Sequence, residues 1–185
     1  TVGYGGNVLF AVVGIVSLIG MSELYKVFKV ENKALGVTGY LAAIAYYAML
    51  LLEKTEWMIP LTLLFLILVM AVYVFTYPTF TAEQVMAVFF GFFYVSVMLS
   101  YVYQTRMLAE GAVLVWLIFL SSWGCDTCAY CVGVLFGKHK MAQKLSPKKS
   151  IEGGVGGILG AALLGALFAL AVNQWAGVTV NPLQY

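Results

Sequence analysis

The chain has 185 residues, of which 63% are hydrophobic and only 10% are charged, and its formal net charge is +2. Soluble domains are typically about 25% charged, so the composition excludes an ordinary soluble enzyme domain. The small net charge gives no reason to expect a nucleic-acid partner.

Long apolar runs follow one another along the chain. About 20 consecutive apolar residues cross a bilayer as a helix. Runs near that length cover residues 2–24, 35–52, 57–76, 84–103, 112–134 and 153–172. They do not alternate between polar and apolar residues as the strands of a transmembrane barrel do. We therefore predict an all-α, polytopic transmembrane helical bundle of about six spans, forming a single membrane domain over residues 1–185.

Basic residues are distributed unevenly over the connections between these runs. The second and fourth connections hold only Lys54 and Arg106. The first and fifth hold the lysines at positions 26, 29, 33, 138, 140, 144, 148 and 149. Lysine-rich connections stay on the cytoplasmic side of a membrane. We therefore expect the connection before the last span to face the cytoplasm, in the plasma (inner) membrane.

The fifth span contains Asp126, the only aspartate of the chain and the only acidic residue well inside a predicted span. A carboxylate near the centre of a span costs about 2.5–3.5 kcal/mol on insertion scales, so it is tolerated where it faces a cation, a metal or a polar cavity. Tyr130 and Gly133 lie one and two turns further on and share its face. Asp126 is therefore a candidate for chemistry, and a structural pairing with a lysine or a hydroxyl is the alternative.

The same span carries Cys125, Cys128 and Cys131, spaced as C-x-x-C-x-x-C. In a soluble protein this spacing would suggest a metal or iron–sulfur site. On a membrane helix without an obvious fourth ligand, we expect small buried thiols, and no disulfide on the cytoplasmic side.

The connection "GKHKMAQKLSPKKSIE", residues 137–152, combines five lysines with the only histidine. Ser146 followed by Pro147 is typical of a helix start. Lys148 and Lys149 would then lie in the first helical turn, where the helix dipole is already positive, and a bound phosphate would explain them. The orientation signal alone is the simpler explanation of the lysines. Glu152 is expected to pair with these lysines or to join a metal site.

Small residues recur in the last span. Helix backbones approach closely at such stripes. The stripe contains Gly153, Gly156, Gly157, Gly160, Ala161 and Gly165. Packing explains the later glycines, whereas those at the mouth of the loop, such as Gly153, would also leave backbone N–H groups open to a phosphate.

Taken together, a carboxylate at the end of one helix and lysines at the start of the next would frame a magnesium–polyphosphate site beside lipid, because magnesium prefers hard oxygen ligands. This arrangement suggests phosphoryl or nucleotidyl transfer onto a lipid head group. An anion transporter, with the lysine loop as a gate, is a second hypothesis. It predicts further charged residues inside several spans, and only Asp126 is found there.

At these residues the sequence resembles the phosphatidate cytidylyltransferase family, also called CDP-diglyceride synthase. The matching segments are "DTCAYCVGVLFGKHK", residues 126–140, and "SPKKSIEGGVGG", residues 146–157. A weaker match, "SELYKVF", residues 22–28, places the family's early acidic residue at Glu23. The resemblance covers nearly the whole chain.

The resemblance implies a magnesium-dependent membrane enzyme that condenses CTP with phosphatidic acid to give CDP-diacylglycerol and pyrophosphate. It further implies a homodimer in the bilayer. It places Asp126 at the metal-linked catalytic centre, with Lys148 and Lys149. The predicted substrate-binding residues are Lys138, His139, Lys140, Ser146, Glu152 and Gly153.

The chain departs from the family pattern at both ends. The family's C-terminal aspartate-rich signature does not occur before Tyr185, and a further span is expected before Thr1. We therefore expect an incomplete membrane domain. The alternative function is a non-catalytic fragment.

Overall fold

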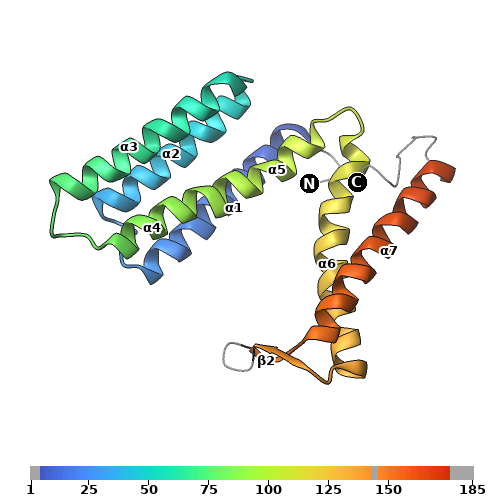
Figure 1. The fold of residues 1–185 in the computed structure, drawn as a ribbon. Helices are drawn as coiled ribbons and strands as arrows, with labels where there is room; N and C mark the ends of the chain where they lie inside the picture. Colours follow the sequence, from blue (N-terminus) through green and yellow to red (C-terminus); the bar gives the residue numbers. More distant parts are fainter. Residues whose placement is uncertain (1–4, 143–145, 176–185) are drawn as a thin grey trace. The chain divides into compact units, whose positions relative to one another are not determined.

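The structure is a computed structural model that describes residues 5–142 and 146–175 (Figure 1). Within these ranges, six helices are long and apolar enough to cross a membrane, as predicted. The helices are α1 (Gly6–Val27), α2 (Ala34–Leu51), α3 (Met58–Phe75), a rod formed by α4 (Ala82–Phe90), η2 (Gly91–Val97) and α5 (Met98–Arg106), α6 (Gly111–Phe136) and α7 (Ile151–Trp175). Short elements are the 3-10 turn η1 (Thr55–Trp57) and the strands β1 (Lys140–Ala142) and β2 (Ser146–Ser150). The all-α transmembrane prediction is confirmed, and the chain is an integral membrane protein.

The chain divides into two compact units, Thr1–Met107 and Leu108–Tyr185. The first contains α1 to α5 and the second contains α6, the two strands and α7. The prediction of a single membrane domain over residues 1–185 stays a prediction.

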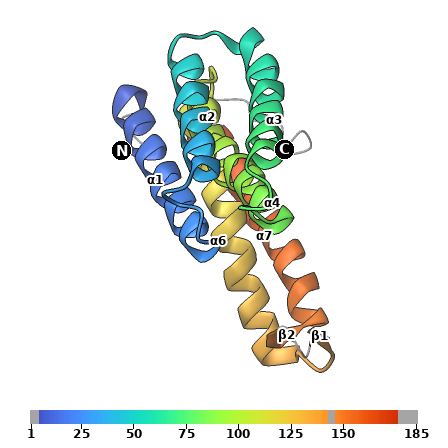
Figure 2. The same cartoon turned by 90° about the vertical axis from the view of Figure 1, so that its left-hand side faces the viewer.

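In the first unit, α2 and α3 lie side by side and the rod packs against α1 and α2 (Figures 1 and 2). Aromatic and aliphatic side chains fill the space between these helices, where their burial stabilises the fold. The fully buried members with large side chains include Leu9, Met21, Tyr25, Leu35, Phe65, Val69, Val88 and Phe92.

Several buried hydroxyl groups of this unit have hydrogen-bond partners, as buried polar groups usually do, whereas the hydroxyls of Tyr40 and Ser96 have none among the described residues. The hydroxyl of Tyr25 donates to the carbonyl of Val88 at 2.9 Å, and Ser17 and Tyr47 share a hydrogen bond of 2.7 Å. The Tyr25 ring also leaves no room for a side chain at Gly91, because a Cβ there would lie 2.6 Å from the ring. Gly91 begins the π-helical segment of the rod, so Tyr25 ties α1 to the place where the rod changes its winding.

In the second unit, α6 and α7 pack closely through the predicted stripe of small residues. A Cβ on Gly156 would lie 2.5 Å from Val132, and one on Gly157 would lie 3.0 Å from the Cys125 carbonyl oxygen. Gly160 packs on Cys128 in the same way, whereas nothing lies within 4 Å of a Cβ on Gly165. The packing prediction is therefore confirmed for the N-terminal half of the stripe and does not extend to Gly165.

Many large apolar side chains remain exposed on the outer faces of the helices. Phe75 is 88% exposed, Ile59 is 74% exposed and Ile158 is 70% exposed. In water such surfaces would drive association. In a bilayer they lie against lipid chains, which are as apolar as the side chains themselves.

Candidate active site

The connection between α6 and α7 is a β-hairpin. β1 and β2 are antiparallel, with Lys140 opposite Ser150 and Ala142 opposite Ser146. The prediction that Ser146 and Pro147 begin a helix is therefore wrong, and Lys148 and Lys149 lie in β2 instead of a first helical turn. A two-stranded hairpin consists only of edge strands, where a proline is tolerated because it need not donate to a neighbour.

Helix α7 begins at Ile151, and Ser150 is its N-cap. Ser150 is 5% exposed, and its Oγ accepts the N–H of Gly153 at 3.2 Å. The N–H of Ile151 donates to the carbonyl of His139 at 2.9 Å. Since the first N–H groups of a helix have no partner within it, these two bonds satisfy half of the usual set. The N–H of Gly153 is thus engaged within the chain, and its contact with a phosphate stays a prediction.

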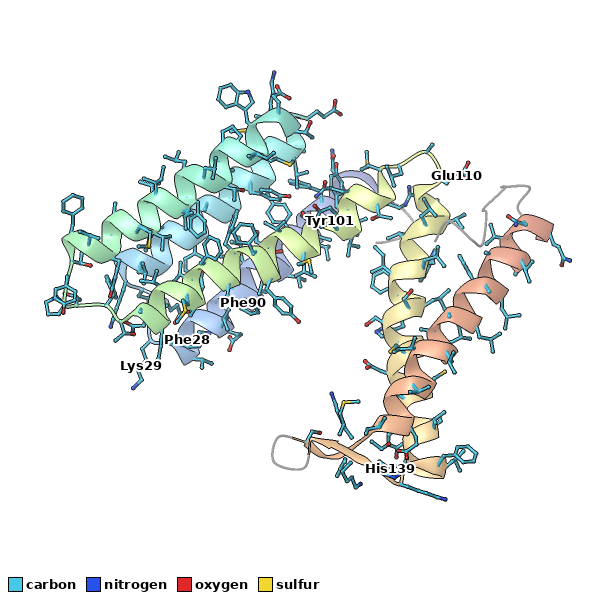
Figure 3. The ribbon with its side chains drawn as sticks, in the orientation of Figure 1. Phe28, Lys29, Phe90, Tyr101, Glu110 and His139 are labelled. Atoms are coloured by element: carbon cyan, nitrogen blue, oxygen red, sulfur yellow. The ribbon has the colours of Figure 1, made fainter. Side chains whose placement is uncertain are left out.

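Glu152 joins the hairpin to the first turn of α7. One carboxylate oxygen lies 2.6 Å from Nδ1 of His139. Both carboxylate oxygens accept the backbone N–H of His139, at 3.2 Å each. Among the described residues, the side-chain partner of Glu152 is His139, whereas the sequence suggested Lys148, Lys149 or a metal. Figure 3 shows His139 at the hairpin end of α6 and α7.

The hairpin carries a cluster of cations. Lys138, Lys140, Lys148 and Lys149 are all exposed. Lys144 lies outside the described residues. Cations gathered at one end of a helix pair raise the local concentration of anions, so this end of the second unit is suited to phosphate groups.

Asp126 lies on α6 and is exposed, as is Tyr130 one turn further on. Gly133, predicted to share their face, packs against α7, where a Cβ would lie 3.2 Å from Ser150 Oγ and 3.7 Å from the Cα of Gly153. The residues named for the site thus occupy one helix pair, but no described contact joins Asp126 to the hairpin lysines.

The three cysteines are free thiols. Cys125 and Cys128 are partly buried against the α7 glycines, as expected of small packing residues, whereas Cys131 is exposed. In the first unit, Glu23 pairs with Lys26 at 2.7 Å.

The described carboxylates are too far apart to form a magnesium site by themselves. Over residues 5–142 and 146–175, no three His, Cys, Asp or Glu side chains gather closely enough to hold a metal ion. Magnesium in phosphate-transfer sites usually keeps several waters and takes one or two carboxylates plus substrate phosphates. Asp126 fits that role as a single carboxylate toward a metal that arrives with a nucleotide, and the described residues do not form a complete site of their own.

Two functional contacts were missed from the sequence. The cap at Ser150 could have been found, because it precedes an acidic residue in the first turn, a standard helix start. The contact between His139 and Glu152 left no signal in the sequence, because it depends on the register of the hairpin.

The chain is similar in sequence to known proteins. Residues 1–183 match the cytidylyltransferase family. A phosphatidate cytidylyltransferase of Staphylococcus epidermidis is 31% identical over 174 residues, covering 91% of this chain and 65% of the relative. The enzyme of the same name from Thermotoga maritima is 30% identical over 179 residues, covering 92% of this chain and 64% of the relative.

That of Staphylococcus aureus is 29% identical over 159 residues, covering 83% of this chain and 60% of the relative. The chain thus spans less than two thirds of the length of these relatives. The match nevertheless includes both the helix of Asp126 and the lysine hairpin. The chain belongs to the cytidylyltransferase family.

Proposed function

We propose that this chain is the part of a phosphatidate cytidylyltransferase that handles the phosphates of its substrates. The enzyme would condense CTP with phosphatidic acid to give CDP-diacylglycerol and pyrophosphate. It would act as a homodimer, with the hairpin facing the cytoplasm at the plasma membrane. The observation that carries the proposal is the hairpin, which presents exposed lysines at the end of two apolar membrane helices. A water-soluble nucleotide and a membrane lipid can meet at such a place.

The proposed reaction needs little covalent chemistry from the protein. The phosphate monoester of phosphatidate already carries an ionised oxygen, which forms a bond to the α-phosphorus of CTP. The bond from that phosphorus to the oxygen bridging to the β-phosphate breaks, and pyrophosphate leaves. Positioned cations that stabilise the developing charge are the largest contribution in reactions of this kind. Lys148 and Lys149 are proposed for this role, with Lys138 and Lys140 holding the substrates.

Magnesium, bound to the triphosphate, would neutralise part of its charge, and Asp126 would supply one oxygen ligand. His139 is not required as a base, since the nucleophile is already ionised. We propose that its pairing with Glu152 holds the hairpin in place.

The test is conversion of labelled CTP and phosphatidate into CDP-diacylglycerol by the full-length protein that contains this chain, in membranes with magnesium. Asp126→Asn and Lys148→Ala are expected to lower kcat/KM by roughly 100-fold, the scale of losing one positioned group that stabilises charge. Lys54→Ala, an exposed lysine in the first unit, is the matched control and should leave the rate unchanged.

Activity that survives both variants would place the chemistry elsewhere in the protein. A wild-type protein that is inert toward phosphatidate and other lipid phosphates would contradict the enzyme and favour an anion transporter or a non-catalytic role.

A further inference from the structure

An apolar groove of about 500 Å³ runs along the α6–α7 pair at its hairpin end. It is lined by Val132 and Phe136 of α6 and by Ile151, Glu152, Val155 and Leu159 of α7. Gly156 also lines the groove, and the two helices come close there, because a Cβ on Gly156 would lie 2.5 Å from Val132.

The length of the groove along α7 is close to the thickness of one leaflet of a bilayer. From Ile151 to Leu159 a helix rises about 12 Å at 1.5 Å per residue. The hydrocarbon core of a bilayer is about 30 Å thick, so one leaflet contributes about 15 Å. Phe136, Val155 and Leu159 are each more than half exposed along this length. The walls therefore suit an acyl chain that enters from the hairpin side.

The hairpin end of the groove adjoins exposed lysines, because Lys140 pairs with Ser150, the residue before Ile151. Lys138 and Lys140 flank His139, whose carbonyl accepts the N–H of Ile151 at the groove's first turn. Lys149 precedes Ile151 by two residues, and all three lysines are exposed. The single acidic lining residue, Glu152, has both carboxylate oxygens engaged by His139. An apolar slot with a cationic mouth complements a lipid that carries an anionic head group.

We propose that this groove holds one acyl chain of the phosphatidate substrate, with its phosphate monoester at Lys138 and Lys140. The inference rests on the proposed function and deepens it, because it assigns the position of the lipid substrate. Neutral and zwitterionic lipids of equal chain length would enter the same slot, but they would gain nothing from the lysines. The lysines therefore select the head group and the groove holds the chain.

The direct test uses phosphatidate with a photoactivatable diazirine in its acyl chain, added to vesicles that contain the full-length protein. Adducts should concentrate on residues 132–136 and 151–159, and phosphatidylcholine with the same chain should label these segments several times less. Equal labelling by both probes would overturn the proposal, since the groove would then be ordinary lipid-facing surface. An unlabelled groove would also overturn it, because another protein surface, such as a second copy of the chain, would then cover these residues.

A kinetic test introduces a larger side chain into the groove. Val155→Phe should raise KM for phosphatidate by roughly tenfold, the scale on which one misplaced group acts in an apolar pocket, and leave KM for CTP unchanged. Ile158→Phe is the matched control, since Ile158 is 70% exposed on the same helix and does not line the groove. A Val155→Phe enzyme with wild-type KM for phosphatidate would contradict the assignment.

The two proposals fail in different ways. Wild-type protein that makes CDP-diacylglycerol but shows no selective labelling of the groove would remove this inference and leave the proposed function intact. Selective labelling without nucleotide transfer would remove the proposed function and leave an anionic-lipid site.

Discussion

Nδ1 of His139 lies 2.6 Å from a carboxylate oxygen of Glu152, which is thirteen residues further along the chain. The same carboxylate accepts the backbone N–H of His139. Together with the bond from Ile151 N–H to the His139 carbonyl, these contacts hold β1 against the first turn of α7. The position of the hairpin lysines therefore depends on a pair formed between the start of the hairpin and the first turn of α7.

Removal of this pair should loosen the hairpin. In Glu152→Ala, the amides of residues 138–142 are expected to exchange hydrogen several times faster than in the wild type, because the acceptor of His139 is lost. Glu152→Gln keeps an oxygen acceptor and should restore much of the protection. Glu110→Ala, at an exposed glutamate of the same unit, is the control. Hydrogen–deuterium exchange with mass spectrometry measures the effect, and unchanged exchange in Glu152→Ala would show that the pair does not hold the hairpin.

Two serine variants test whether Ser150 or Ser146 caps the start of α7. Ser150→Ala removes the oxygen that accepts Gly153 N–H, and loss of an N-cap costs about 0.5–2 kcal/mol. Ser146→Ala lies in β2 and should have little effect on stability. Thermal denaturation in detergent, followed by circular dichroism, compares the two. A larger loss for Ser146→Ala would restore the helix start predicted from the Ser146–Pro147 pair.

The sequence predicted the membrane helices well because their signal is local. Each span is recognised by its own run of apolar residues, and a helix satisfies its backbone within the same run. The hairpin was missed because Ser146–Pro147 has the features of a helix start. The strand that pairs with this segment lies on the other side of the loop, so the local sequence does not indicate it. Side-chain identity at 146 and 147 does not distinguish a capped helix from an edge strand.

The site was predicted only in part for a related reason. The lysines and Asp126 could be selected by type, since charge near a membrane span is costly and needs an explanation. Side-chain contacts could not be selected in this way, because the contact of Glu152 with His139 and, in the first unit, that of Tyr25 with Val88 join segments through tertiary packing. The latter pair is 63 residues apart, far beyond any periodic signal.

The close approach of α6 and α7 should depend more on Gly160 than on Gly165. Gly160→Ala places a Cβ against Cys128, and overpacking of this kind typically costs about 1–3 kcal/mol. Gly165→Ala meets nothing within 4 Å, so it should be neutral or mildly stabilising, as alanine is the better helix former. Melting temperatures in detergent compare the two variants. Equal losses would mean that the helices separate too easily for this packing to matter.

The link between α1 and the π segment rests on Tyr25. Tyr25→Phe keeps the ring beside Gly91 and removes the hydrogen bond to Val88, a net loss of about 0.5–1.5 kcal/mol for a buried bond. Tyr94→Phe is the matched control, because Tyr94 lies on the rod that also contains Val88 and is 60% exposed. Thermal denaturation should show a lower Tm for Tyr25→Phe alone. A similar Tm for both variants would indicate that packing of the ring, and not its hydroxyl, joins the two helices.

Magnesium is expected to bind with the nucleotide and not before it. A single exposed carboxylate such as Asp126 offers a weak site by itself, whereas triphosphate oxygens and one carboxylate together satisfy the ion. Ligands that bind the folded state raise Tm by mass action, so CTP with magnesium should stabilise the full-length protein, and magnesium or CTP alone should do so much less. Asp126→Asn should reduce this joint stabilisation, and Lys54→Ala should leave it unchanged. A rise in Tm with magnesium alone that persists in Asp126→Asn would instead indicate a resident metal site built from other residues of the protein.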